Sequence, residues 1–170
     1  CANVMGRWNR QRAADLVAHG SRVDQSEARK CLEIADALND GYDASRGIHE
    51  QFPGFWGLDR SLIGKLSARP IMADEEFGRA RVKASQIIKQ PDVLMLHHLI
   101  PEGLPPGSLA RDLAYYDPLT AHGSSLSPPI HASLLARAGR ADEALEMFSI
   151  ATRLDLDDLT HTTGRGVHLA

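Results

Sequence analysis

The sequence lacks several features that would each point to a particular class of protein. No apolar run approaches the roughly 18 residues that a membrane-spanning helix needs, and no signal-peptide pattern stands at the start. Basic residues are not in excess, since 19 Lys and Arg stand against 22 Asp and Glu for a net charge of −3. A large basic field is therefore missing, which argues against a nucleic-acid partner. We expect a protein that binds neither membranes nor nucleic acid.

Cysteine is scarce as well, because the chain contains only Cys1 and Cys31. Two cysteines are too few for a disulfide framework, and their spacing matches no metal-site pattern. We therefore expect free thiols in a reducing cytoplasm, and no metal ion.

The chain has 170 residues, of which 43% are hydrophobic. That is enough to bury a core, and it amounts to one domain or a piece of one. The sequence opens on Cys-Ala-Asn-Val without an initiating Met, and it closes on four residues, 167–170, without a helix stop signal. We expect a fragment of a longer catalytic domain.

Helical periodicity dominates the chain and predicts the all-α class, built from helical hairpins. Asp24 or Ser26 is suited to cap a helix, and Pro91 is suited to the first turn of another. Residues 47–58 are the exception, because Gly, Pro and aromatic residues there favour an extended loop, or a short strand and a turn. The predicted helices cover approximately residues 4–17, 24–40, 75–89, 91–99, 109–115, 128–138 and 141–154.

The most informative loop spans residues 115–128, which contain two Tyr, one His and three Ser ahead of a helix start. Hydroxyls, an imidazole and freed backbone donors at a helix start suit a polyoxygenated ligand such as a sugar or a phosphate. We predict that Ser127 caps the helix that Pro128 begins. Ser124 and Ser125 are not needed for the cap and are better candidates for ligand contacts, with His122 beside them.

Lys89 and Gln90 form a second polar island at a predicted helix break, where backbone groups need partners. An ammonium and an amide side by side can hydrogen-bond adjacent sugar hydroxyls. A solvent-exposed Lys-Gln pair at a helix end is the alternative interpretation. Glu50, among aromatic residues, could bind a sugar or could cap a turn.

The end of the chain contains a third polar island, residues 160–168. Its Gly164-Arg165-Gly166 turn precedes His168, and consecutive backbone N–H groups at such a turn can bind an anion. The alternative is a flexible tail.

A non-enzymatic module is a further alternative. Residues 134–148 are similar to one tetratricopeptide unit, a helical hairpin that binds peptides. A solenoid needs the pattern at a fixed period, and we find no second copy.

Taken together, these stretches resemble glycoside hydrolase family 65, the maltose, trehalose and kojibiose phosphorylases with some hydrolases. The resemblance covers nearly the whole chain in the same order. The motifs that carry it are Asn3-Val4-Met5 with Trp8-Asn9, Glu50-Gln51-Phe52 with Gly54-Phe55, Ile88-Lys89-Gln90 with Asp92-Val93, Tyr115-Tyr116 through Ser124-Ser125-Leu126-Ser127-Pro128 to His131, Asp155 to Leu159, and Gly166-Val167-His168.

The resemblance implies an incomplete (α/α)6 barrel over residues 1–170, with the family's N-terminal β-sandwich and the first part of the barrel absent. It implies inverting phosphorolysis of an α-glucosidic disaccharide to β-glucose 1-phosphate and a sugar, or hydrolysis in a trehalose-type variant. The general-acid Glu is expected before Cys1, so no catalytic residue is expected in this chain.

By the same resemblance, Lys89 and Gln90 hold the glucosyl unit, with Glu50 as a further substrate-binding candidate. Ser124, Ser125, His168 and Gly166 hold phosphate, with His122 as a neighbour. The expected partners are a disaccharide, inorganic phosphate as co-substrate and the rest of the catalytic domain, with no cofactor. A homodimer of the full-length protein is left open.

The chain also departs from the family pattern. Pro91 and Pro129 replace Ala, and Arg165 replaces a common Glu. Thr162-Thr163 fills a position where the maltose enzymes carry Thr-His. These departures leave both the disaccharide and the choice between phosphorolysis and hydrolysis open.

Overall fold

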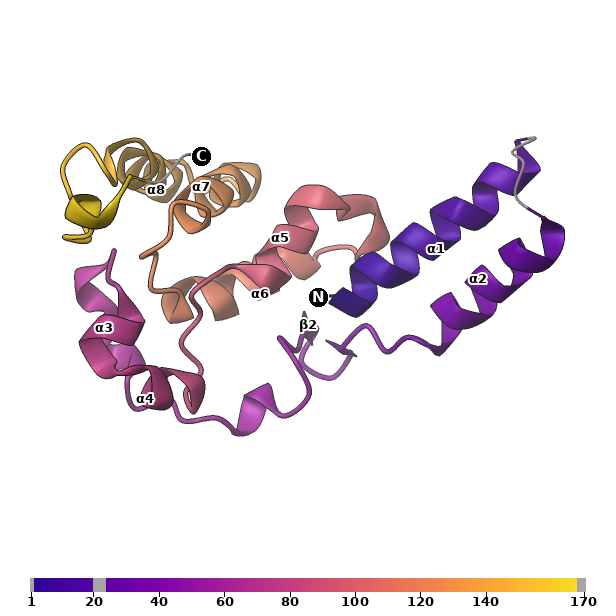
Figure 1. The fold of residues 1–170 in the computed structure, drawn as a ribbon, viewed down its shortest axis with the longest axis horizontal. Helices are drawn as coiled ribbons and strands as arrows, with labels where there is room; N and C mark the ends of the chain where they lie inside the picture. The colour runs from indigo at the N-terminus through magenta and orange to yellow at the C-terminus, as the bar shows by residue number, and fades with distance from the viewer. Residues whose placement is uncertain (1, 20–23, 168–170) are drawn as a thin grey trace. The chain divides into compact units, whose positions relative to one another are not determined.

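The computed structural model describes residues 2–19 and 24–167, and most of them are helical (Figure 1). The chain divides into two compact units, Cys1–Pro53 and Gly54–Ala170. Over the described ranges, no helix combines the length and the apolar character needed to cross a membrane. The all-α prediction is confirmed in its main point, since short strands supplement the helices in a few places only.

The N-terminal unit consists of two packed helices, α1 (Ala2–Ala18) and α2 (Gln25–Ala37). Asp24 caps α2, because its Oδ1 accepts from the backbone N–H of Ser26 at 3.2 Å. Arg7 of α1 donates to the carbonyl of Ala35 at 3.2 Å and to Oδ2 of Asp40 at 2.6 Å. One side chain thus fastens α1 to the end of α2.

A small antiparallel hairpin follows within the same unit. Strand β1 (Tyr42–Asp43) pairs with β2 (Ile48–His49), and Tyr42 lies opposite His49. The prediction of a short strand within residues 47–58 is confirmed, but β1 lies before the predicted range.

The C-terminal unit contains the remaining helices and most of the core. They are α3 (Ala73–Phe77), α4 (Arg79–Lys83), α5 (Asp92–Leu99), α6 (Ser108–Tyr116), α7 (Ser127–Arg137) and α8 (Ala141–Arg153), with short 3₁₀ turns at Phe55–Gly57, Ile63–Ala68, Pro101–Gly103, Asp117–Leu119 and Thr163–Arg165. Helices α7 and α8 pack together as predicted, and Gly139 between them has φ of 76°. A left-handed turn of this kind suits glycine.

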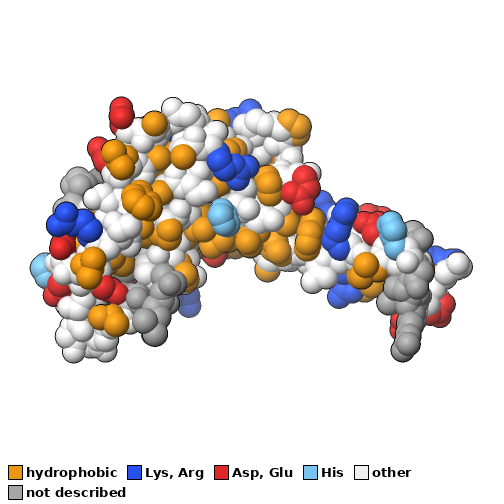
Figure 2. Space-filling view, turned by 90° about the horizontal axis from the view of Figure 1, so that it is seen from above, with side chains coloured by type: hydrophobic (Ala, Val, Ile, Leu, Met, Phe, Trp, Pro, Cys, Tyr) orange, Lys and Arg blue, Asp and Glu red, His pale blue; other side chains and the backbone are white. Residues whose placement is uncertain are grey.

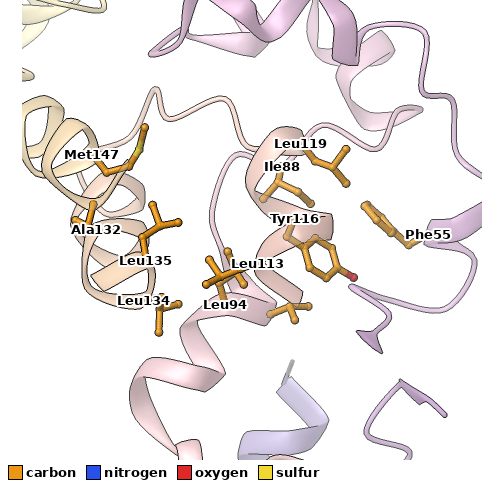
Figure 3. Packing of buried hydrophobic residues seen from close by; sticks show 12 residues of the cluster. Phe55, Ile88, Leu94, Leu113, Tyr116, Leu119, Ala132, Leu134, Leu135 and Met147 are labelled. Carbon is orange, nitrogen blue, oxygen red and sulfur yellow. The ribbon is translucent and has the colours of Figure 1, made fainter. Parts of the chain in front are cut away.

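Apolar side chains of α5, α6, α7 and α8 meet in one cluster (Figure 3). Leu94, Leu113, Tyr116, Leu135 and Met147 all contribute to it. Each is at most 8% exposed, so burial of apolar area is the main stabilising contribution to this unit.

The predicted helix over residues 75–89 is wrong. Two short helices stand there, α3 and α4, and they are separated by Gly78 with φ of 82°. After Lys83 the chain is not helical, because the backbone N–H of Gln86 donates to the carbonyl of Asp59 at 2.8 Å and the backbone N–H of Ile88 donates to the carbonyl of Leu119 at 2.8 Å. Contacts far away in sequence therefore override a helical pattern that looked continuous.

Apolar side chains also remain on the surface of the C-terminal unit. Leu145 and Phe148 of α8 are 66% and 57% exposed, and Leu156 is 84% exposed. Figure 2 shows hydrophobic side chains interspersed with charged ones on the face it presents.

Candidate active site

Three extended segments of the C-terminal unit lie side by side and carry the candidate site. The segment at residues 119–122 is central: Ile71 forms a parallel bridge with His122, and Ile88 forms one with Thr120. The Ile71 N–H donates to the Ala121 carbonyl at 2.9 Å, and the Ala121 N–H donates to the Ile88 carbonyl at 2.9 Å. Because the bridges are parallel, the residues that follow each of them emerge at the same end.

A pocket of about 220 Å³ lies at that end. It is lined by Ile71, Met72, Ala73, Asp74, Lys89, Gln90, Ala121, Gly123 and Ser124. Three of the predicted site residues, Lys89, Gln90 and Ser124, therefore surround one hollow. Their predicted binding roles stay predictions.

Lys89 forms an ion pair with Asp74 in the wall of this pocket. Its Nζ lies 2.7 Å from Oδ2 of Asp74, and the two side chains are 54% and 24% exposed. Gln90 follows directly and is exposed, and its carbonyl accepts from the N–H of Asp92 at 2.9 Å. The pocket wall thus offers an ammonium, a carboxylate and an amide to a ligand.

Gly123 brings the serine loop against the segment at Ile71. A Cβ atom built on Gly123 would lie 2.3 Å from the carbonyl oxygen of Ile71 and 2.9 Å from its carbonyl carbon. No side chain fits at that distance, so glycine is required for the close approach. Ser124 therefore reaches the pocket wall, while Ser125 is half-buried in the same loop.

Gln86 anchors the segment that contains Ile88 and leads to Lys89 and Gln90. It is 1% exposed, and its Nε2 donates to the carbonyls of Phe55 and Trp56 at 3.1 Å each. Its Oε1 accepts from the hydroxyl of Tyr115 at 2.8 Å. A buried amide with its groups satisfied fixes the position of the residues that follow it.

The aromatic pair that begins the polar loop is structural in this arrangement. Tyr115 supports Gln86, and Tyr116 is 1% exposed within the apolar core. Both lie at the end of α6.

His122 lies next to the pocket but is not among its lining residues. The side chain is fully buried, and Nδ1 lies 2.7 Å from Oγ of Ser127. The prediction that Ser127 caps α7 is wrong, because the helix begins at Ser127 itself without a side-chain cap and the hydroxyl is used by His122. The backbone of His122 is in the left-handed region, with φ of 57°.

A second histidine completes this buried cluster. The rings of His122 and His131 lie 4.5 Å apart, edge to face, and Nδ1 of His131 lies 2.8 Å from Oδ1 of Asp117. Burial, the neighbouring His131 and the Arg69 guanidinium lower the pKa of His122 to about 3. Burial alone would raise the pKa of Asp117, but the hydrogen bond with His131 and the charges of His131, Arg69 and His122 together outweigh it and hold that pKa below its usual value. His122 is therefore neutral at physiological pH.

Potential ligand atoms of Asp117, His122 and His131 lie within 4.8 Å of one another, a spacing that a metal site would also have. Asp117 and the Nδ1 of His131 are bonded to each other, and the Nδ1 of His122 is bonded to Ser127. The buried Nε2 atoms of His122 and His131 have no hydrogen-bond partner among the described residues.

The remaining predicted residues lie elsewhere. Gly166 borders a second hollow of about 330 Å³ together with Met72, Glu75 and Arg165. Met72 also lines the first pocket, so the two hollows are neighbours. His168 lies outside the described residues. Glu50 belongs to the N-terminal unit, where its backbone N–H donates to the Gly41 carbonyl at 2.7 Å. The roles of these three residues stay predictions.

Arg165 is held by an ion pair at the second hollow. Its Nη2 lies 2.8 Å from Oε2 of Glu75 in α3, and this hydrogen bond lowers the pKa of the Glu75 carboxyl. The C-terminal loop is thereby tied to the helix that also carries Asp74.

Sequence reasoning missed Asp74 and Met72. Asp74 begins the acidic run Asp74-Glu75-Glu76 in the first turn of α3, where carboxylates are common because they complement the helix N-terminus. The sequence signal was therefore that of an ordinary helix start, and only the bridges of the folded chain bring Asp74 to Lys89.

Comparisons with known proteins identify the family of this chain. The family model described as "Glycosyl hydrolase family 65 central catalytic domain" matches residues 1–170. Kojibiose phosphorylase of Escherichia coli (strain K12) is 37% identical over 99% of this chain and 22% of its own length. Alpha,alpha-trehalose phosphorylase of Thermoanaerobacter brockii is 42% identical over 99% of this chain and 24% of its own length.

A solved structure, "Putative kojibiose phosphorylase from human microbiome", has a TM-score of 0.71 and 32% identity over 85% of this chain and 20% of that one. The chain thus spans about a fifth to a quarter of the length of these relatives. Both the sequence and the fold point to one family, and the chain belongs to glycosyl hydrolase family 65, within its central catalytic domain.

Proposed function

We propose that this chain is part of the catalytic (α/α)6 barrel of a disaccharide phosphorylase, which cleaves an α-glucosidic bond with phosphate to give β-glucose 1-phosphate and a second sugar. The observation that carries the proposal is the meeting of Lys89, Gln90 and Ser124 around one pocket. These residues come from two of the motifs that resemble the family, and the relatives named above are phosphorylases of kojibiose and trehalose.

The glucosyl unit occupies the side of the pocket formed by Lys89 and Gln90. An amide offers two donors and one acceptor, and an ammonium offers three donors. Together they can bind adjacent hydroxyls and fix the orientation of the sugar ring. Correct orientation of the anomeric carbon is itself a large contribution to rate, because misplacement by about 1 Å can cost about 10²-fold.

Phosphate binds at the serine side, where Ser124 and Ser125 offer hydroxyl donors, together with Gly166 and His168 of the terminal loop. Hydroxyl, imidazole and backbone donors stabilise the negative charge of the phosphate as it attacks. The attack comes from the face opposite the glycosidic oxygen, so the product has the inverted configuration. The general-acid carboxyl that protonates the leaving oxygen is supplied by residues outside this chain.

The exposed apolar side chains of α8, Leu145 and Phe148, are contact sites for the other helices of the same barrel. The two residues are three positions apart and so lie on one face of the helix, and this face supplies the interaction with the rest of the catalytic domain that the proposal requires.

Turnover by the full-length protein tests the proposal. We expect release of glucose 1-phosphate from trehalose, maltose or kojibiose only when inorganic phosphate is added. The β-configuration of the initial product is checked by NMR. Glucose release at the same rate without phosphate would contradict phosphorolysis and support the hydrolase alternative.

A further inference from the structure

We propose that Asp74 is an additional substrate-binding residue, whose carboxylate accepts hydrogen bonds from hydroxyls of the glucosyl unit beside Lys89 and Gln90. This inference rests on the proposed sugar-binding role of the pocket and extends that role to a residue that the motifs of the sequence do not include.

The geometry of Asp74 suits a direct contact. The side chain lines the pocket and is 24% exposed, so most of it is fixed in the wall while part faces the hollow. Its Oδ2 holds Nζ of Lys89 at 2.7 Å. Within the described part of the chain, no group hydrogen-bonds its Oδ1. A carboxylate has about four acceptor positions, so one ammonium leaves room for sugar hydroxyls.

The charges of the pocket lead to the same assignment. Lys89 is the one cationic residue among those that line it, and Asp74 is the one anionic residue. The pair is neutral as a whole, which suits an uncharged ligand rich in hydroxyls. A phosphate placed against Asp74 would meet a like charge, so the carboxylate also keeps phosphate on the side of Ser124.

A carboxylate at this position also contributes specificity. A site built to accept a hydroxyl hydrogen rejects an analogue that lacks the hydroxyl, because the polar group of the protein is then left without a partner. Asp74 therefore discriminates glucosyl units with the correct hydroxyl from their deoxy analogues.

The alternative is that Asp74 acts only by positioning Lys89. The two roles differ in a double-mutant cycle, because a positioning residue has no further effect once Lys89 is removed. A residue that contacts the sugar itself keeps an effect in the absence of Lys89.

The experiment uses the full-length protein and the variants Asp74→Asn, Asp74→Ser, Lys89→Met and Asp74→Asn with Lys89→Met. Glu76→Gln is the matched control, because it removes one negative charge from the same helix at a residue that does not line the pocket. Glucose binding is measured by calorimetry, and KM is measured for the disaccharide and for phosphate. Thermal unfolding midpoints verify that each variant is folded.

We expect Asp74→Asn to weaken glucose binding and raise the disaccharide KM by about tenfold, with the phosphate KM within about twofold. Glu76→Gln should leave all three values within about twofold. In the Lys89→Met background, Asp74→Asn should still weaken glucose binding severalfold. No further loss in that background would overturn the proposal, as would unchanged glucose binding in both folded Asp74 variants.

The outcome also separates this inference from the proposed function. Turnover that is independent of phosphate, combined with weakened glucose binding in Asp74→Asn, would overturn phosphorolysis and support the role of Asp74.

Discussion

One loop of this protein places its polar side chains in two opposite environments. Ser124 lies at an open pocket beside the charged pair of Asp74 and Lys89. Ser127 and His122 lie in a closed interior, where both are fully buried and bonded to each other. The comparison shows that polar residues in one short motif can have separate tasks, some facing a ligand and others holding the loop that presents them.

The two environments also differ in whether their side chains carry charge. At the pocket, two partly exposed side chains of opposite charge, Lys89 and Asp74, form an ion pair. In the buried cluster, the desolvation penalty keeps His122 neutral, with a pKa of about 3. The buried side is therefore the part of the loop whose stability depends on pH, and the pocket side is the part that a ligand can reach.

The largest expected effect comes from the residue that joins both environments. Gly123→Ala places a Cβ 2.3 Å from the carbonyl oxygen of Ile71, so the bridge to that segment must separate. We expect turnover of the full-length protein to fall by at least about a hundredfold and the thermal midpoint to fall as well. Gly57→Ala is the control, because a Cβ there meets no atom within 4 Å. Equal activity of the two variants would show that the close approach is not needed.

The second-largest expected effect is a pH dependence of folding stability, and it comes from the buried histidine cluster. The pKa of His122 is about 3 in the folded chain, against an ordinary 6.5. Between these values the unfolded chain binds a proton that the folded chain does not, so stability is lost as the pH falls from about 6.5 towards 3. The expected slope is about 1.4 kcal/mol per pH unit.

This slope is measured from thermal unfolding of the full-length protein at several pH values. His122→Asn removes the titrating ring, and Asn tolerates the left-handed backbone found at this position. We expect a shallower dependence in that variant and an unchanged one in His98→Gln, since His98 is exposed. The same slope in all three proteins would refute the assignment to His122.

The smallest effects separate two serines three residues apart. Ser127→Ala removes the buried partner of His122, and we expect a loss of stability of about 1–2 kcal/mol with the phosphate KM unchanged. Ser124→Ala removes a donor at the pocket, and we expect the phosphate KM to rise about fivefold with stability unchanged. If each substitution affects both quantities, the division of the loop into two environments is wrong.

Much of the fold could be predicted from the sequence, because its signals are local. Asp24 caps α2, Pro91 precedes α5, and the packed pair α7 and α8 follows from apolar periodicity and Gly139. The helix predicted over residues 75–89 failed for the opposite reason. Residues 86–88 are held by hydrogen bonds to Asp59 and Leu119, which no local pattern reports.

The candidate site, like the fold, could be predicted only where the signal lies in a local stretch of sequence. Lys89, Gln90 and Ser124 could be selected from motif resemblance, and they do meet at one pocket. Their partner Asp74 could not, because its position in the chain is that of an ordinary acidic helix start. The contact between Ser127 and His122 was also missed. A serine before a proline at a helix start usually caps the helix, but here the Ser127 hydroxyl hydrogen-bonds the buried ring of His122.

The parallel bridges have a consequence for how such a pocket can change over time. Ile71, Ile88 and Ala121 are joined through main-chain N–H and carbonyl groups, and these bonds are indifferent to which side chain a residue carries. Substitutions at Met72, Gln90 or Ser124 can therefore alter what the hollow accepts without dismantling the frame. New sugar preferences can arise one residue at a time, provided that Gly123 is kept.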